Sequence, residues 1–165
     1  MTSGKKILLL GGIALAVLGM TYGLWYAVFA EHQALDGIGA SLSGAFSAAA
    51  NRDAAASEKS LLQYREAKYA YDRQVDVHGH WIGLGMLLIV LAIGFDRVAL
   101  SEKSKAFLAT ALFLGALLFP LGVLMQTASH GALPKAVAIG GSALVMISLA
   151  GMTLGFALNQ APAED

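Results

Sequence analysis

Four long apolar stretches constrain the fold of this 165-residue chain more than any other feature. They cover about residues 7–30, 79–95, 106–127 and 136–158. Crossing the hydrocarbon core of a bilayer takes a helix of roughly 20 apolar residues. The second stretch is short and needs residues 77–80 to complete its span. The sequence therefore predicts one membrane domain, an all-α integral membrane four-helix bundle.

The composition supports a membrane protein and excludes several classes of site. Hydrophobic residues make up 57% of the chain and charged residues 13%, against about 45–50% and about 25% in soluble domains. The net charge is zero, so the chain does not have the excess of basic residues that is typical of a nucleic-acid-binding protein. Because there is no cysteine, disulfides, thiolate metal sites and iron–sulfur clusters are excluded. Any metal or cofactor must be held by His, Met, carboxylates or the backbone.

The basic residues of the short segments predict the orientation. Lys5 and Lys6 precede the first span, and three basic residues lie in the connection 96–105. Short cytoplasmic segments are enriched in Lys and Arg, so we expect both termini, including the tail 161–165, on the cytoplasmic side. The first span is too long for the apolar region of a secretory signal and is expected to be retained. The chain is then a multi-pass protein of the inner (cytoplasmic) membrane.

The outer segment 31–78 has two unlike halves. Residues 36–50 are rich in Gly, Ala and Ser with weak periodicity, and no element is predicted there. Residues 51–77 contain neither Gly nor Pro and are rich in helix formers. They predict an amphipathic helix at the outer face of the membrane that continues into the second span. A solvated spacer helix is the alternative.

All four histidines are predicted at the outer end of the bundle. His32 follows the first span, His78 and His80 precede the second, and His130 follows the third. Nearby polar groups could orient a ligating imidazole. The candidates for that role are Glu31 beside His32, Asp76 two residues before His78, and Gln126 one helical turn before His130.

Helix geometry restricts the His-Gly-His motif. Residues two apart on a helix point about 200° away from each other, so His78 and His80 cannot both face one centre. A helix break at Gly79 would remove this restriction.

Three interpretations of the histidines stay open. Two of them, from different helices, could ligate haem b, with room at Gly83 and an aromatic wall from Trp25 and Phe29. Three or four could instead bind copper, zinc or iron, with Glu31 or Met125. In the third interpretation they only hydrogen-bond water and lipid headgroups. The favoured interpretation is haem b or a transition metal at the outer face, held by His32, His130 and one of His78 or His80. It would serve electron transfer or a respiratory complex.

The different-class alternative is a cofactor-free structural or assembly subunit. Gly-xxx-Gly spacings in the spans permit close helix packing, and the expected partners are the lipid bilayer and other membrane protein subunits or a second copy. No charged residue lies inside a span, which argues against a proton pump. An enzyme acting on a lipid or small hydrophobic substrate is a weaker third option, so the chain is not expected to be an enzyme on its own.

The His pair that opens the second span and the Gly140-Gly141 step in the fourth also carry a family resemblance. With the hairpin FLATALFLGALLFPLG…AIGGSALVMISLAGMTLG, they resemble a small four-span membrane protein family of unknown function in bacteria and mitochondria. The segment VHGHWIGLGML is similar to the His-bearing helix starts of haem-binding membrane proteins. The first resemblance implies a four-span fold, and the second implies haem ligation at His78 or His80. The 48-residue outer segment is longer than the connection in that family.

Overall fold

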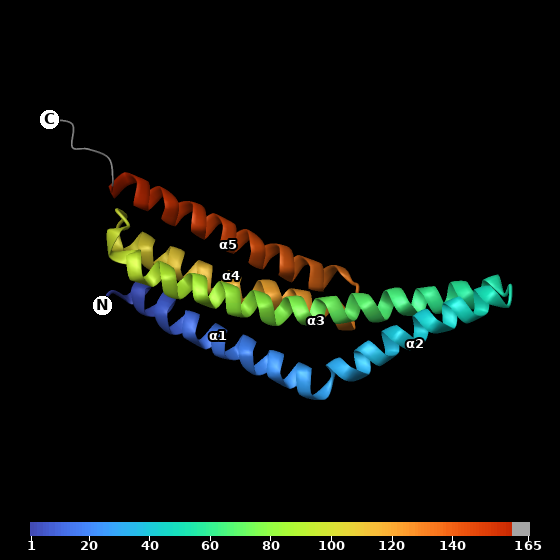
Figure 1. Cartoon of the computed structure of the whole chain (residues 1–165). Coiled ribbons are helices and arrows are strands. Elements are labelled where there is room, and N and C mark those ends of the chain that lie inside the picture. Colours follow the sequence, from blue (N-terminus) through green and yellow to red (C-terminus); the bar gives the residue numbers. More distant parts are fainter. Residues whose placement is uncertain (160–165) are drawn as a thin grey trace.

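The chain folds into five α-helices and one short 3-10 helix (Figure 1), as described by a computed structural model of residues 1–159. The elements are α1 (Ser3–Phe29), α2 (Glu31–Ala50), α3 (Ala54–Gly94), η1 (Phe95–Arg97), α4 (Glu102–Ala128) and α5 (Ala132–Asn159). Four of the helices, α1, α3, α4 and α5, are long and apolar enough to cross a membrane. This confirms the predicted all-α membrane four-helix bundle.

The first residues of α1 and the last residues of α5 lie at the same end of the bundle (Figure 1). The predicted cytoplasmic tail 161–165 lies outside the described residues. The opposite end carries α2 and the first half of α3, which form a hairpin extending beyond the other helices. We call it the hairpin end.

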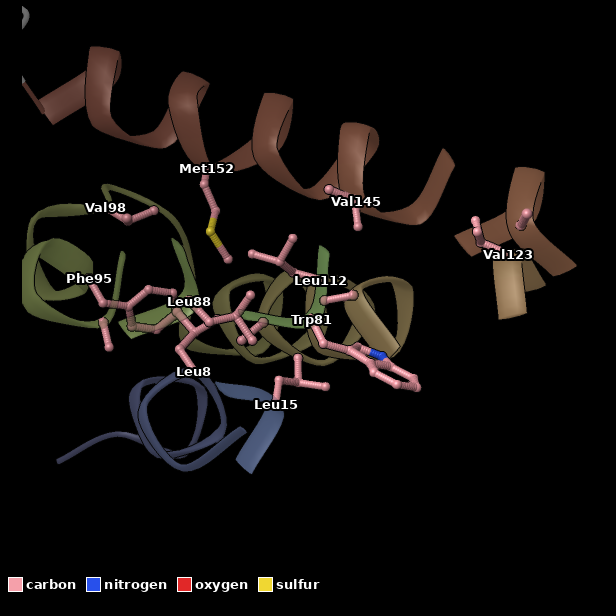
Figure 2. Packing of buried hydrophobic residues seen from close by; sticks show 14 of the residues in the cluster. Leu8, Leu15, Trp81, Leu88, Phe95, Val98, Leu112, Val123, Val145 and Met152 are labelled. Atoms are coloured by element: carbon pink, nitrogen blue, oxygen red, sulfur yellow. The ribbon is translucent and has the colours of Figure 1, made fainter. Parts of the chain in front are cut away.

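The apolar core runs along the contacts of α3 with α1 and α4, and of α4 with α5. Figure 2 shows side chains from all four long helices meeting there. The core includes Leu8 and Leu15 of α1, Trp81 and Leu88 of α3, Leu112 of α4 and Met152 of α5. Helix α5 packs mainly on α4 and has little contact with α3. One side of α3 is therefore left open.

Glycines set the closest helix contacts. A Cβ on Gly12 of α1 would lie 2.6 Å from the carbonyl oxygen of Gly85 in α3, and a Cβ on Gly85 would lie 2.7 Å from the carbonyl oxygen of Gly12. A Cβ on Gly122 of α4 would lie 2.7 Å from Cα of Ala138 in α5. Such spacings leave no room for a side chain, so these backbones pack in direct contact.

Helix α3 has no break at Gly79. It continues from Ala54 to Gly94, about 60 Å at about 1.5 Å per residue. Val77 and Trp81, on either side of the glycine, are both buried. Their packing holds the helix through a residue whose propensity penalty is only about 1 kcal/mol.

Helix α2 occupies residues to which the sequence assigned no element. Its interface with α3 includes small residues: Ala45 is buried, and the Ser57 hydroxyl donates to the Ala45 carbonyl over 3.2 Å. Arg52 closes the turn in the left-handed region at φ 59°, and Asp53 caps α3 by accepting from the amide of Ala56. The Gly, Ala and Ser content that gave no periodic pattern is what lets α2 lie close against α3.

Candidate functional site at the hairpin end

The structure places all four histidines at the hairpin end, on different surfaces. His32 lies in the first turn of α2, with a side chain 90% exposed and its Nε2 3.5 Å from the Asp36 carboxylate. His130 follows α4 and is 60% exposed; its ring lies 5.2 Å from that of Tyr69, and its Nε2 is 3.9 Å from Glu66. Neither is enclosed by the bundle.

His78 and His80 point to different neighbours because α3 is continuous. His78 lies against α1, where a Cβ on Gly23 would be 3.1 Å from its ring. His80 lies against α4, with its ring edge-on to Phe119 at a centroid distance of 4.8 Å. The divergence predicted for a helical His-Gly-His motif is thus present.

The predicted metal cluster is not assembled within the described part of the chain. Among residues 1–159, no group of three or more His, Asp or Glu side chains could hold a metal ion. The four histidines contact different partners, on α1, α2, α3 and α4. A site of three or four histidines, with or without Glu31, therefore has no support from the geometry.

Two of the three residues expected to orient histidines, Glu31 and Gln126, have other partners. Glu31 accepts from the Tyr71 hydroxyl over 3.2 Å, and Gln126 accepts from the Tyr69 hydroxyl over 3.1 Å. Desolvation raises the pKa of Tyr71, and its hydrogen bond to Glu31 raises that pKa further, so the hydroxyl stays protonated and donates at neutral pH. These bonds tie the hairpin together and to α4.

The proposed haem-contact residues are dispersed. Trp25 and Phe29 are more than half exposed on α1, while the neighbouring Tyr22 packs edge-on against Trp81 of α3. Gly83 lies on α3 with nothing within 4 Å of a Cβ placed there. The aromatic pair and Gly83 therefore do not form one pocket wall.

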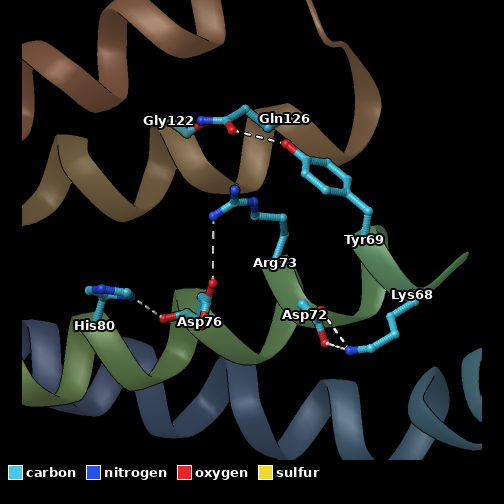
Figure 3. Close-up of polar contacts among 8 residues, drawn as sticks. All are labelled: Lys68, Tyr69, Asp72, Arg73, Asp76, His80, Gly122 and Gln126. Carbon is cyan, nitrogen blue, oxygen red and sulfur yellow. Dashed lines mark hydrogen bonds and ion pairs between the residues drawn. The ribbon is translucent and has the colours of Figure 1, made fainter. Parts of the chain in front are cut away.

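Five polar residues form a row along one side of α3, which we call the polar row. Its members are Glu66, Tyr69, Arg73, Asp76 and His80, at alternating spacings of three and four. Figure 3 shows four of them in succession on α3, with α4 alongside. This row was not singled out from the sequence, although its spacing is the ordinary signal of a helix face.

Contacts within the polar row fix its members. The Arg73 guanidinium lies 5.0 Å from the centre of the Tyr69 ring and 3.6 Å from the Asp76 carboxylate. Nδ1 of His80 is 2.6 Å from the Asp76 backbone carbonyl (Figure 3). A carbonyl can only accept, so Nδ1 carries the proton and donates, which leaves Nε2 of the neutral ring with a free lone pair.

At its His80 end, the polar row borders an open groove of about 480 Å³. Its lining consists of Val75, Asp76, Gly79, His80, Gly83 and Leu84. A Cβ on Gly79 or on Gly83 would meet no atom within 4 Å, so both glycines leave free space beside α3. The groove combines a carboxylate and an imidazole at one end with an apolar surface at the other, and Arg73, the ion-pair partner of that carboxylate, lies next to the lining residues.

Comparisons with known proteins give no relative from which a function could be taken: no family model, curated protein or solved structure matches the chain. The family and haem-protein resemblances stay predictions. The function has to be inferred from the geometry of this chain.

Proposed function

We propose that the chain is a cofactor-free structural or assembly subunit of a membrane complex, whose α2–α3 hairpin contacts partner proteins. Because α3 continues without interruption from the turn at Asp53 into the bundle, the hairpin is rigidly joined to the membrane-spanning part. A bilayer core about 30 Å thick accommodates only about half of α3. The remainder extends into the aqueous phase with α2 packed along it.

The outward surface of α2 is the observation that carries this proposal. No charged residue occurs from residue 37 to residue 51. Phe46 is nonetheless 70% exposed, and Leu35, Ser43 and Ala50 are exposed on the same helix. An uncharged surface with an exposed aromatic ring in an aqueous region is typical of a protein contact site.

The adjoining part of α3 has the opposite character. Eight charged residues occur between Ala54 and Asp76, among them the Lys68–Asp72 pair at 2.8 Å. The hairpin therefore has one side suited to water and one suited to another protein. This asymmetry supports a directional contact through α2.

Introducing a charge at Phe46 tests this function. We expect Phe46→Asp to reduce the size of the assembly that mild detergent extracts from native membranes, because burying an unpaired carboxylate at a contact is costly. Native gel electrophoresis of the full chain measures this, with circular dichroism to verify folding. Gln63→Asp, at an exposed position of α3, adds the same charge and should leave the size unchanged. A wild-type chain that migrates at its own mass would refute the proposal.

Haem b at His80 is a second candidate, supported by one observation. The Asp76 carbonyl orients the ring through Nδ1, as outer partners commonly orient a ligating imidazole, and the ring lines an open groove. The described residues bring no second histidine to this groove, so His80 would be the only ligand from this chain. A bound haem would supply electron transfer.

An absorption spectrum of the full chain, purified from cells with ample haem, tests this second candidate. A Soret band that His80→Ala abolishes and His32→Ala preserves would support it. The matched control is apt because the His32 side chain is 90% exposed. A spectrum without the band, combined with metal analysis showing no copper, zinc or iron, would reject haem and metal binding and favour the structural role.

A further inference from the structure

We propose that the groove beside the polar row binds a phospholipid with an ammonium headgroup, such as phosphatidylethanolamine. In this arrangement the phosphate contacts Arg73, the ammonium contacts Asp76, and one acyl chain follows the surface at Gly79 and Gly83. The inference does not depend on the proposed structural role.

The depth of the groove matches the headgroup region of a bilayer. The last charged residue of α3 before its apolar run is Asp76, and that run begins at Trp81. His80 thus lies at the boundary between the polar and the apolar parts of the helix. Asp76 lies about 6 Å above it at about 1.5 Å per residue, within the roughly 5–8 Å headgroup layer of one leaflet, and the Arg73 guanidinium lies 3.6 Å from the Asp76 carboxylate.

The charged residues Arg73 and Asp76, at one end of the groove, favour a headgroup that carries both a positive and a negative charge. Arg73 and Asp76 form a loose ion pair at 3.6 Å with partly exposed side chains. A guanidinium has five N–H donors, and most of those of Arg73 are not used by Asp76. Arginine is well suited to phosphate, and the carboxylate beside it offers a complementary site for an ammonium. The nearby Glu66 faces His130 rather than the groove.

The end of the groove at Gly79 and Gly83 suits an acyl chain. Gly79 and Gly83 lie one turn apart and have no neighbouring atom within 4 Å of a Cβ position. Leu84 adds an apolar wall. Helix α5 packs on α4 and has little contact with α3, so the described residues 1–159 do not cover this surface. A chain lying against the two glycines would fill the space that their missing side chains leave.

Lipid retention by the purified full chain tests the proposal. The protein is reconstituted in nanodiscs containing equal amounts of phosphatidylethanolamine, phosphatidylcholine and phosphatidylglycerol, and the lipids that stay bound are identified by native mass spectrometry. We expect phosphatidylethanolamine to be enriched about fivefold, which corresponds to about 1 kcal/mol of preferential binding. Arg73→Gln and Gly83→Leu should each abolish the enrichment.

Gly140→Leu is the matched control, because Gly140 is an equally open glycine on α5, outside the groove. Equal retention of the three lipids, or enrichment that survives Gly83→Leu, would overturn the proposal. Preferential retention of phosphatidylglycerol would also overturn it, because Asp76 would then have no role. A Soret band that depends on His80 would assign the groove to haem instead.

Discussion

Replacing Gly141 by alanine should lower the thermal unfolding midpoint of the purified protein by several degrees, whereas the same change at Gly140 should not. A Cβ on Gly141 would lie 2.8 Å from the backbone Cα of Phe119 in α4. Because the obstacle is backbone and not a flexible side chain, α4 and α5 must move apart. The expected cost is about 1–3 kcal/mol, as for other overpacked sites.

The neighbouring Gly140 provides the control for this experiment. It lies in the same helix, is exposed, and has no atom within 4 Å of a Cβ position. Alanine there should leave stability unchanged or raise it by up to about 1 kcal/mol, because alanine is the better helix former. Thermal unfolding of both variants in one detergent, followed by circular dichroism, measures the difference. Equal midpoints would show that α4 and α5 are not in backbone contact at Gly141.

The spans were predictable because a bilayer leaves few alternatives. Backbone groups in hydrocarbon must be paired within the protein, so a long apolar run becomes a helix. Gly140 and Gly141 show where this reasoning ends. They are neighbouring glycines in the same span, yet a Cβ on Gly141 would meet the backbone of α4, whereas a Cβ on Gly140 would meet no atom of the described residues within 4 Å. Only the rotation of α5 about its axis, which depends on packing, distinguishes them.

The histidines show a similar division. The order of the spans predicts that all four histidines lie at the same end of the bundle. Helix geometry predicts that His78 and His80 point in different directions. The intact helix at Gly79 does not follow from the sequence, because the buried neighbours that hold it depend on tertiary packing. The polar row could be predicted from the spacing of its residues along the sequence. The groove beside it could not be predicted, since its open side depends on α5 packing on α4 and having little contact with α3.

Helix α2 is the element that depends most on tertiary contacts. Three glycines, at positions 37, 39 and 44, lower its intrinsic propensity by about 1 kcal/mol each relative to alanine. Small side chains bring it close to α3, where Ala45 is buried and Ser60 lies beside Gly44. We infer that packing against α3, and not the local sequence, keeps this segment helical.

Overpacking the hairpin at Ala45 should therefore make α2 open more often while the spans stay intact. Ala45→Leu adds a branched side chain at a position that is 4% exposed, at a cost of about 1–3 kcal/mol. Amide hydrogen exchange in α2 should become about 5- to 150-fold faster, the change that this cost gives for local opening. Ala40→Leu, at an exposed position of the same helix, should leave exchange unchanged. If α2 kept its protection in Ala45→Leu, its helix would be stable without the contact to α3, and the hairpin would not depend on close packing of small residues.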